Sequence, residues 1–325
     1  MFKLVSFAVI SLVAAVPPSP TSTPGAGIAI SADGLKNAKN VVVPLVFSNL
    51  DELKIPSVPI PGYGSFDNLD IHLPMPAESD IQLNLDSASN GLEVFGQNLG
   101  MNMTADFVFK KVITVTGSAN IKIKNIGLDL ELGFDTQADV NNGELAPKLS
   151  VVKNSIKINP DDIDVELSGS LVAKIAGIFI PIIKNSIIPG VVTKIEDAIT
   201  AGIANASSEL SIYGTQAVIP FLAGVTIDYA QFNAGPKVTD DKWFAMDING
   251  TFFDQDDITV SQFTPAVFPA YNADGKTAQG YLTDYVLNTM FDAGFRTGNT
   301  LNITEIISKF SNLTVTTDDL ALVVP

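Results

Sequence analysis

Few side chains in this chain of 325 residues are of the types that perform chemistry. His72 is the only histidine and cysteine is absent, which excludes thiol chemistry and the zinc sites that His and Cys ligands usually build. His72 stands between Ile71 and Leu73 in an alternating segment, so we expect its imidazole to face outward. The sequence has neither a G-x-S-x-G nucleophile motif nor a phosphate-binding loop. We therefore expect a protein that is not an enzyme and that uses no metal or cofactor.

Carboxylates are the remaining candidates for chemistry. The chain has thirty-five Asp and Glu but only nineteen Lys and Arg, which gives a formal net charge of −16. Two carboxylates that the fold brings together can catalyse hydrolysis, but no spacing in the sequence singles out a pair. Residues 247–257, DINGTFFDQDD, lack the oxygen spacing and final glutamate of a calcium loop, and we expect a solvated loop there. The excess of acids disfavours nucleic acid as a partner and strong attraction to an anionic membrane.

The N-terminus predicts export. Within residues 1–15 a lysine precedes an apolar run and two alanines, as in a secretory signal peptide, and residues 16–24 form a proline-rich spacer. The later apolar stretch 171–192 contains lysines and prolines, so no transmembrane segment is expected. We therefore expect a secreted protein, and the presence of glycosylation sequons agrees with secretion. The predicted glycosylation sites are Asn102, Asn205, Asn249, Asn302 and Asn312.

Two segments have the apolar spacing of helices that bury one face. The first is residues 34–53, where Pro44 should introduce a kink. Its apolar face consists of Leu35, Ala38, Val42, Leu45 and Val46. The second is residues 187–210. Its apolar face consists of Ile188, Val191, Val192, Ile195, Ala198, Ile199, Gly202 and Ile203.

Between these helices, apolar residues alternate with polar ones and predict half-buried strands. Leu69, Ile71 and Leu73 belong to one such strand. The series continues with Ile81, Leu83 and Leu85, and later with Leu128, Leu130 and Leu132. Turn signals at Asn90-Gly91, Asn142-Gly143 and residues 159–162 (NPDD) predict that neighbouring strands pair antiparallel.

The second helix mixes branched aliphatic residues with Gly and Ala on its inner face, and two explanations remain open. Small residues allow close packing of a helix against a sheet. Alternatively, they leave an elongated apolar cavity that holds an acyl chain, in which each buried methylene contributes ~0.8 kcal/mol.

Local motifs and their order resemble the bactericidal/permeability-increasing and lipopolysaccharide-binding protein family. PGAGIAISADGLKNA resembles the family's opening strand and helix, and ELKIP resembles the exit of that helix. NASSELSIYG resembles the end of the second long helix, and GVTIDYAQFNAGPKVTDDKWFAMDINGTFF resembles the return strands. The resemblance spans residues 24–253 and implies an α+β fold, in which a highly curved antiparallel sheet wraps around a long helix to form a tubular lipid-binding barrel.

The resemblance also implies domains and site residues. Residues 25–257 would form the N-terminal lipid-binding barrel, and residues 258–325 a central-sheet segment and the start of a truncated second barrel. A helix at 279–295 would open that second barrel and could contact a protein partner. Lipid tails would lie near Val42, Leu45, Val46, Val191, Ile195, Ile199 and Ile203.

Two departures separate the chain from antibacterial members of that family. It has no cysteine for their disulfide, and their basic hairpin is reduced to Lys110 and Lys111, which are weak candidates for a lipid head group. We therefore expect a secreted protein that sequesters or transfers a phospholipid or similar amphiphile, with transient membrane contact. The alternatives are an innate-defence factor that binds lipopolysaccharide and a non-catalytic interaction scaffold.

Overall fold

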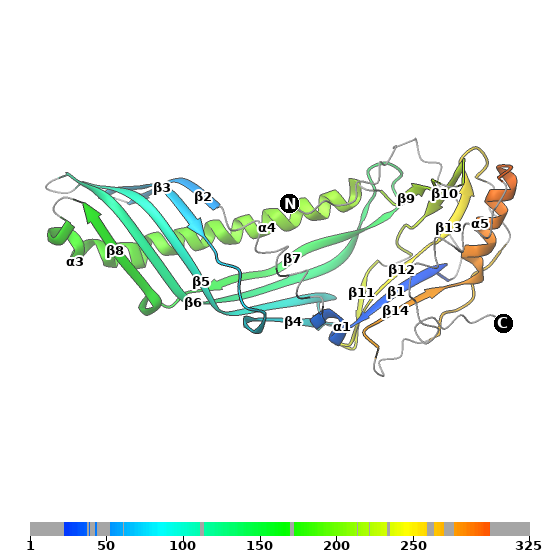
Figure 1. Ribbon diagram of the computed structural model, residues 1–325, viewed down its shortest axis with the longest axis horizontal. Coiled ribbons are helices and arrows are strands. Elements are labelled where there is room, and N and C mark those ends of the chain that lie inside the picture. Colours follow the sequence, from blue (N-terminus) through cyan, green and yellow to red (C-terminus); the bar gives the residue numbers. More distant parts are fainter. Residues whose placement is uncertain are drawn as a thin grey trace.

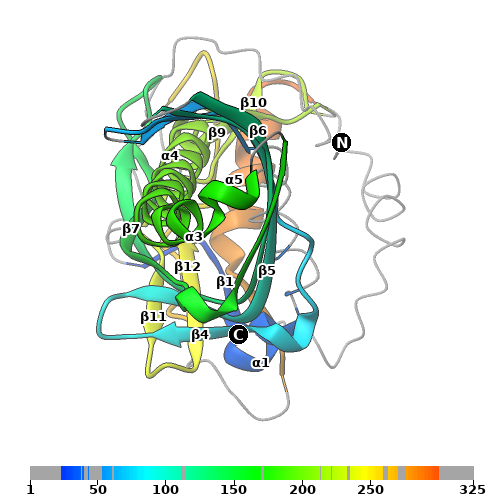
Figure 2. The ribbon, with the colours of Figure 1, turned by 90° about the vertical axis from the view of Figure 1, so that its left-hand side faces the viewer.

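The computed structural model shows an elongated molecule, with a long curled sheet at one end and two smaller sheets at the other (Figure 1). A long helix runs along the inside of the curled sheet, and the view along the long axis shows strands curving around this helix (Figure 2). The structure describes residues 23–37, 39, 43, 53–60, 62–110, 114–169, 172–212, 214–220, 222–232, 235–258, 263–269 and 276–299.

The curled sheet is antiparallel, with the strand order β2-β3-β5-β6-β7, and with β4 paired to β5 and β8 paired to β6. Its strands are β2 (Leu53–Ile60), β3 (Gly64–His72), β4 (Ile81–Asp86), β5 (Gly91–Lys110), β6 (Thr114–Ala138), β7 (Leu145–Lys157) and β8 (Ile163–Gly169). The predicted alternation is confirmed, because Leu69 and Ile71 are buried while His72 is exposed. The curled antiparallel sheet around one long helix confirms the α+β class.

Along one edge of each of the two longest strands, β5 and β6, two shorter strands follow one another with a break between them. On β5, residues 102–109 pair with β3 and residues 91–96 pair with β4. On β6, residues 127–138 pair with β7 and residues 117–123 pair with β8. The prediction that strands on either side of 159–162 pair with each other is therefore wrong. Because β6 is long enough for two partners, β7 and β8 follow one another along its edge.

The long helix is built from α3 (Val172–Ile182), a π-helical turn (Ile183–Ile187) and α4 (Ile188–Ile212). The predicted second helix is confirmed by α4. Pro181 and Pro189 flank the π-helical turn, where the ladder of backbone hydrogen bonds has to change because proline donates none. The inner side of this helix and the inner face of the curled sheet together form the main apolar core.

The other end of the molecule contains two smaller antiparallel sheets and two helices. One sheet has the order β11-β12-β1-β14, and the other has the order β13-β10-β9. The first contains β1 (Ala26–Ser31), β11 (Lys237–Thr239), β12 (Trp243–Ile248) and β14 (Ala278–Leu282). The second contains β9 (Gln216–Val218), β10 (Val225–Asp228) and β13 (Thr251–Asp254). Helix α1 (Ala32–Asn37) follows β1, and α5 (Asp284–Arg296) packs beside β13 (Figure 1).

The prediction of one helix over 279–295 is wrong in its first part. Residues 278–282 form β14, which pairs along β1, and the helix begins at Asp284. The apolar spacing of this segment fits a helix, but its backbone pairs with a strand about 250 residues earlier and therefore forms a strand. Most of the predicted helix over 34–53 lies outside the described residues, apart from the end of α1. None of the helices in the described ranges combines the length and apolar character that a bilayer span requires.

Candidate functional site

The interruptions of both edge strands fall at the same level of the curled sheet as bulges in β5 and β6. The chain leaves the edges at residues 73–80 and 158–162, and the register shifts beside Asn98 and Asn125. Both asparagines have left-handed backbone, with φ of 55° and 54°, a conformation that Asn tolerates better than most residues. Bulges bend strands and redirect side chains. We call this level, with its two bulges and two interruptions, the bulge line.

An apolar slot lies on the inner side of the bulge line, between the curled sheet and α4. The cavity between its walls is small, with a volume of about 20 Å³. Its lining residues are Leu73, Leu99, Met101, Ile126, Leu128, Ile156, Ile158, Ile195 and Ile199. All of these side chains are hydrocarbon or thioether, so the slot suits hydrocarbon and offers a polar head group no partner among the described residues.

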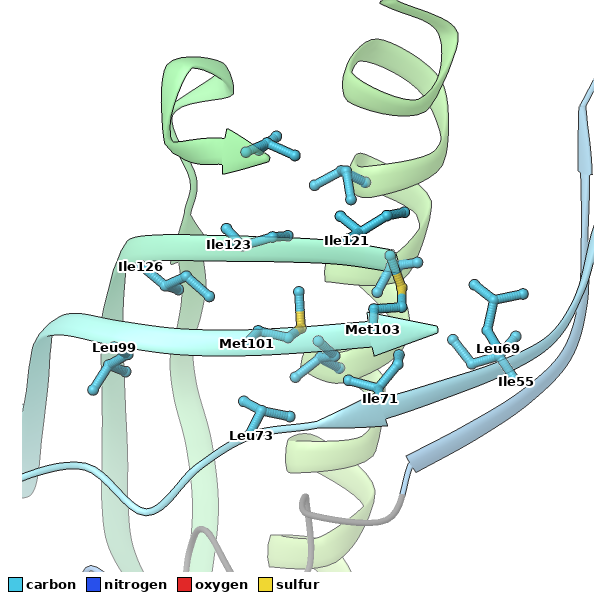
Figure 3. Packing of buried hydrophobic residues seen from close by; sticks show 14 of the residues in the cluster. Ile55, Leu69, Ile71, Leu73, Leu99, Met101, Met103, Ile121, Ile123 and Ile126 are labelled. Atoms are coloured by element: carbon cyan, nitrogen blue, oxygen red, sulfur yellow. The ribbon is translucent and has the colours of Figure 1, made fainter. Parts of the chain in front are cut away.

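The walls of the slot stand close together. Met101, Ile195 and Ile199 are only 1, 2 and 6% exposed. Figure 3 shows Leu99, Met101 and Met103 in succession along β5, beside Ile126, Ile123 and Ile121 of β6. The slot is therefore a narrow seam in a packed core. A bound chain would have to part side chains of the sheet from those of α4.

Polar contacts fix α4 against the outer edge of β7 next to the slot. The carboxylate of Glu196 accepts a hydrogen bond from the backbone N–H of Ile156 at 2.9 Å, and the amide of Asn154 donates to the carbonyl of Glu196 at 2.8 Å. Further along, the Ser207 hydroxyl accepts from the N–H of Leu149 at 3.1 Å. These bonds satisfy edge groups of β7 and hold the slot residue Ile156 beside the helix.

The structure brings some predicted tail-contacting residues together and separates others. Ile195 and Ile199 line the slot. Val191 is fully buried one turn earlier in the helix, and Ile203 is half-buried one turn later. The three predicted residues of the first helix, Val42, Leu45 and Val46, lie outside the described residues.

The glycines of the second helix support neither of the two explanations offered for them. Gly202 is exposed, and a Cβ atom on either Gly202 or Gly190 would meet no atom within 4 Å. Close approach to the sheet therefore does not require them, and neither residue lines the slot. The placement of Gly202 on the inner face is wrong, because that position falls at the margin of the buried face.

The sheet side of the slot was not predicted. Leu99, Met101 and Ile126 face the interior because the bulges at Asn98 and Asn125 shift the alternation. The available signal was an asparagine followed two residues later by glycine in each of two unusually long strands, Asn98-Leu-Gly and Asn125-Ile-Gly.

The weak head-group candidate Lys110 is exposed at the far end of the curled sheet, and Lys111 lies outside the described residues. Asp106 lies four residues before Lys110 on β5, opposite Asp67 of β3. The hydroxyls of Ser57 and Ser65 donate to Asp67 and hold the pKa of that carboxyl below its ordinary value, so this end of the sheet keeps negative charge at neutral pH.

The predicted glycosylation sites differ in accessibility. Asn102 and Asn205 are exposed. Asn249 is 3% exposed, and its side-chain amide donates to Asp228 at 2.9 Å. A glycan on Asn249 is incompatible with this folded arrangement, because its amide nitrogen is enclosed. Asn302 and Asn312 lie outside the described residues.

A buried acidic cluster joins the curled sheet to the smaller sheets. It contains Asp139 and Glu144 from the β6–β7 turn and Asp228 from the end of β10. The Thr215 hydroxyl lies 3.1 Å from Asp139 and 2.8 Å from Glu144, and the N–H of Ala230 donates to Asp228 at 2.8 Å. The described residues contain no group of three acidic or histidine side chains arranged to hold a metal.

Burial dominates the electrostatics of this cluster. Desolvation, and next the negative charge of Glu144, raise the pKa of Asp228 to about 7. Desolvation also raises the pKa of Glu144. One oxygen of Glu144, Oε1, is buried without a hydrogen-bond partner among the described residues. The pair is therefore best satisfied when it holds a proton.

Comparisons with known proteins identify the fold. No protein-family model and no curated protein sequence matches the chain. Thirteen chains of solved structures match it. The crystal structure of lipopolysaccharide binding protein matches with a TM-score of 0.61 and 17% sequence identity, covering 82% of this chain and 58% of that one. Epiphyas postvittana Takeout 1 matches with a TM-score of 0.39 and 14% identity, covering 56% of this chain and 94% of that one. This chain thus spans 58% of the length of lipopolysaccharide binding protein, and it has the tubular α+β fold that its motifs predicted.

Proposed function

We propose that this chain is a non-catalytic, secreted lipid carrier that holds the hydrocarbon of an amphiphile in the slot between α4 and the bulge line. The observation that carries the proposal is the composition of the slot, whose nine lining residues are all apolar. A polar head group would stay at the mouth, where water can hydrate it.

Apolar burial would supply the affinity. A chain that buries about ten methylene groups gains roughly 8 kcal/mol, which corresponds to a dissociation constant near the micromolar range before the cost of ordering. Parting the closely packed walls adds a further cost. Reversible binding in or above that range suits a carrier that has to release its cargo.

The test is a titration of the delipidated full chain with a fluorescent fatty acid analogue. We expect saturable binding with the fluorescence increase that follows transfer into an apolar site. Ile199→Trp should weaken binding at least tenfold, because the indole occupies the slot. Ile203→Trp is the matched control, since Ile203 lies on the same helix but does not line the slot. Absence of saturable binding, or equal effects of both variants, would count against the proposal.

Capture of lipopolysaccharide by charge is a second candidate, because lipopolysaccharide binding protein shares the fold. The net charge of −16 disfavours it. Binding to lipopolysaccharide vesicles at increasing salt separates the two candidates, since a charge-driven complex weakens with salt whereas burial of hydrocarbon does not.

An interaction scaffold is the third candidate, and the outer face of α5 favours it. Leu287, Phe291 and Phe295 recur every four residues along this helix and are 41, 42 and 82% exposed. Exposed apolar residues in such a row are typical of contact surfaces. Measuring the molecular mass of the full chain and of a Leu287→Ser/Phe295→Ser variant in solution tests this role, because a scaffold should lose its complex.

A further inference from the structure

The interior of the curled sheet changes character between the slot and the far end of the barrel. At that end, Phe179 of α3 packs against Phe66, Phe107 and Phe109, with ring centroids 5.3, 4.8 and 5.1 Å away. Tyr63 stacks on Phe109 at 5.4 Å. We call these five rings the aromatic cluster. Its four phenylalanines are at most 3% exposed.

The aromatic cluster fills the space between α3 and the strands β3 and β5. Phe179 is in contact with rings on three sides, and offset and tilted ring pairs are favourable arrangements that resist separation. Phe107 also lies directly over Gly117, where an added Cβ would be 2.8 Å from the ring. A hydrocarbon chain that enters at the slot therefore cannot pass this cluster without breaking several ring contacts.

Between the slot and the aromatic cluster, β5 contributes two unbranched residues, whereas its neighbours β3 and β6 contribute the branched residues Ile71, Ile121 and Ile123, each at most 2% exposed. Met101 and Met103 follow each other on β5, and they are the two methionines among the described residues of the main core. Methionine has three rotatable bonds and a polarisable thioether, so it can move aside at low cost. Beyond them, Ala105 of β5 faces Ala119 of β6, and these small side chains occupy little space.

In the opposite direction from the slot, the main core contains no methionine among the described residues. There the inner residues are branched, namely Val94 of β5, Leu83 of β4 and Leu130 of β6, and they are at most 3% exposed. Valine and leucine have fewer rotatable side-chain bonds than methionine, so they move aside less easily inside a packed core. The path of least resistance for a chain longer than the slot thus leads past Met101 and Met103.

We propose that the slot takes one unbranched hydrocarbon chain, that the chain extends by displacing Met101 and Met103, and that the aromatic cluster sets the greatest chain length. From Met101 to Phe107 the strand covers six residues, or about 20 Å at roughly 3.3 Å per residue. The ligand class is a single-chain amphiphile whose head group remains at the bulge line. This inference rests on the proposed function, since it specifies the ligand of the same slot.

The experiment measures the affinity of the delipidated full chain for saturated fatty acids from decanoic to docosanoic acid, by displacement of a fluorescent fatty acid analogue. For the wild-type chain we expect affinity to increase with length up to a limit and then to fall. Met103→Phe should weaken binding of the longest tolerated acid at least tenfold while changing decanoic acid binding less than twofold. Phe179→Leu should move the limit to longer acids.

Leu130→Phe is the matched control, because it adds the same ring on the other side of the slot and should leave the limit unchanged. Met103→Ile keeps the volume similar but removes flexibility, and it should also weaken binding of long acids selectively. It keeps the inference testable if the ring in Met103→Phe prevents folding, which circular dichroism would reveal. Lysophosphatidylcholines should show the same limit as fatty acids with equal chains.

The outcomes separate the inference from the proposed function. If the wild-type chain binds no fatty acid and no lysophospholipid, the proposed function fails. If it binds them with no length limit, or if Leu130→Phe shortens the limit and Met103→Phe does not, binding stands and the path toward the aromatic cluster is wrong. A limit that differs between the two head groups would likewise contradict the inference, because the head group would then enter the slot.

Discussion

Replacing Asp228 with asparagine should remove most of the pH dependence of stability that the buried acidic cluster causes. Asp228 is fully buried and its pKa is raised to about 7 by desolvation and by the charge of Glu144. In the unfolded chain the same carboxyl should titrate near its ordinary value of 3.8. The folded protein binds this proton more tightly than the unfolded chain does. The free energy of unfolding therefore falls as pH rises from about 4 to about 7.

The magnitude follows from the separation of the two pKa values. A shift of about three units at about 1.36 kcal/mol per unit amounts to roughly 4 kcal/mol as an upper limit. Relaxation around the charged pair should reduce this to a few kcal/mol. For a domain of this size, about 2 kcal/mol corresponds to a change of roughly 4–8 °C in the melting temperature.

The assay compares thermal unfolding of wild-type and Asp228→Asn protein at pH 5 and pH 8. The wild-type chain should melt at a lower temperature at pH 8, and the variant should show a smaller difference, because an amide carries no charge at either pH. Asp256→Asn, which removes an exposed carboxyl, is the control. If Asp228→Asn retains the wild-type pH dependence, or if it is the less stable protein at pH 8, the reasoning about this cluster is refuted.

Three further predictions concern the contact of α4 with β7, the bulge at Asn98 and the burial of Asn249. Glu196→Ala should lower the free energy of unfolding by about 1–3 kcal/mol, because the N–H of Ile156 loses its charged acceptor; chemical denaturation measures this, with the exposed Glu209→Ala as the control. Asn98→Val should cost about 1–2 kcal/mol, because a branched residue resists left-handed backbone, whereas Asn98→Gly should cost less; equal losses would argue against the bulge. Mass spectrometry of glycopeptides from chain secreted by a eukaryotic host should find Asn249 unmodified, since its side chain is enclosed, and a glycan there would show that this burial is wrong.

The helix side of the slot could be predicted because helical periodicity is local. Ile195 and Ile199 lie four residues apart, so their shared face follows from the sequence without knowledge of the rest of the fold. Gly202 shows the limit of the same reasoning. Periodicity places it near the buried face, but the width of that face depends on how far the sheet curls around α4.

The sheet side of the slot could not be predicted because it depends on strand register. Alternation fixes which residues face inward only while a strand stays regular, and the bulges beside Asn98 and Asn125 shift it in both long strands. The segment 278–282 illustrates the same limit, since its partner β1 lies at the other end of the chain. The acidic cluster likewise combines side chains that only the tertiary fold brings together.

Photolabelling would reveal whether hydrocarbon occupies the seam between α4 and the bulge line. The delipidated full chain would be irradiated with a fatty acid that carries a diazirine in its chain, and the labelled peptides identified by mass spectrometry. Label is expected on the segment that contains Leu99 and Met101 and on the segment that contains Ile195 and Ile199, and both labels should be lost in Ile199→Trp. Label confined to α5 or to other outward-facing segments, unchanged in that variant, would contradict binding in that seam.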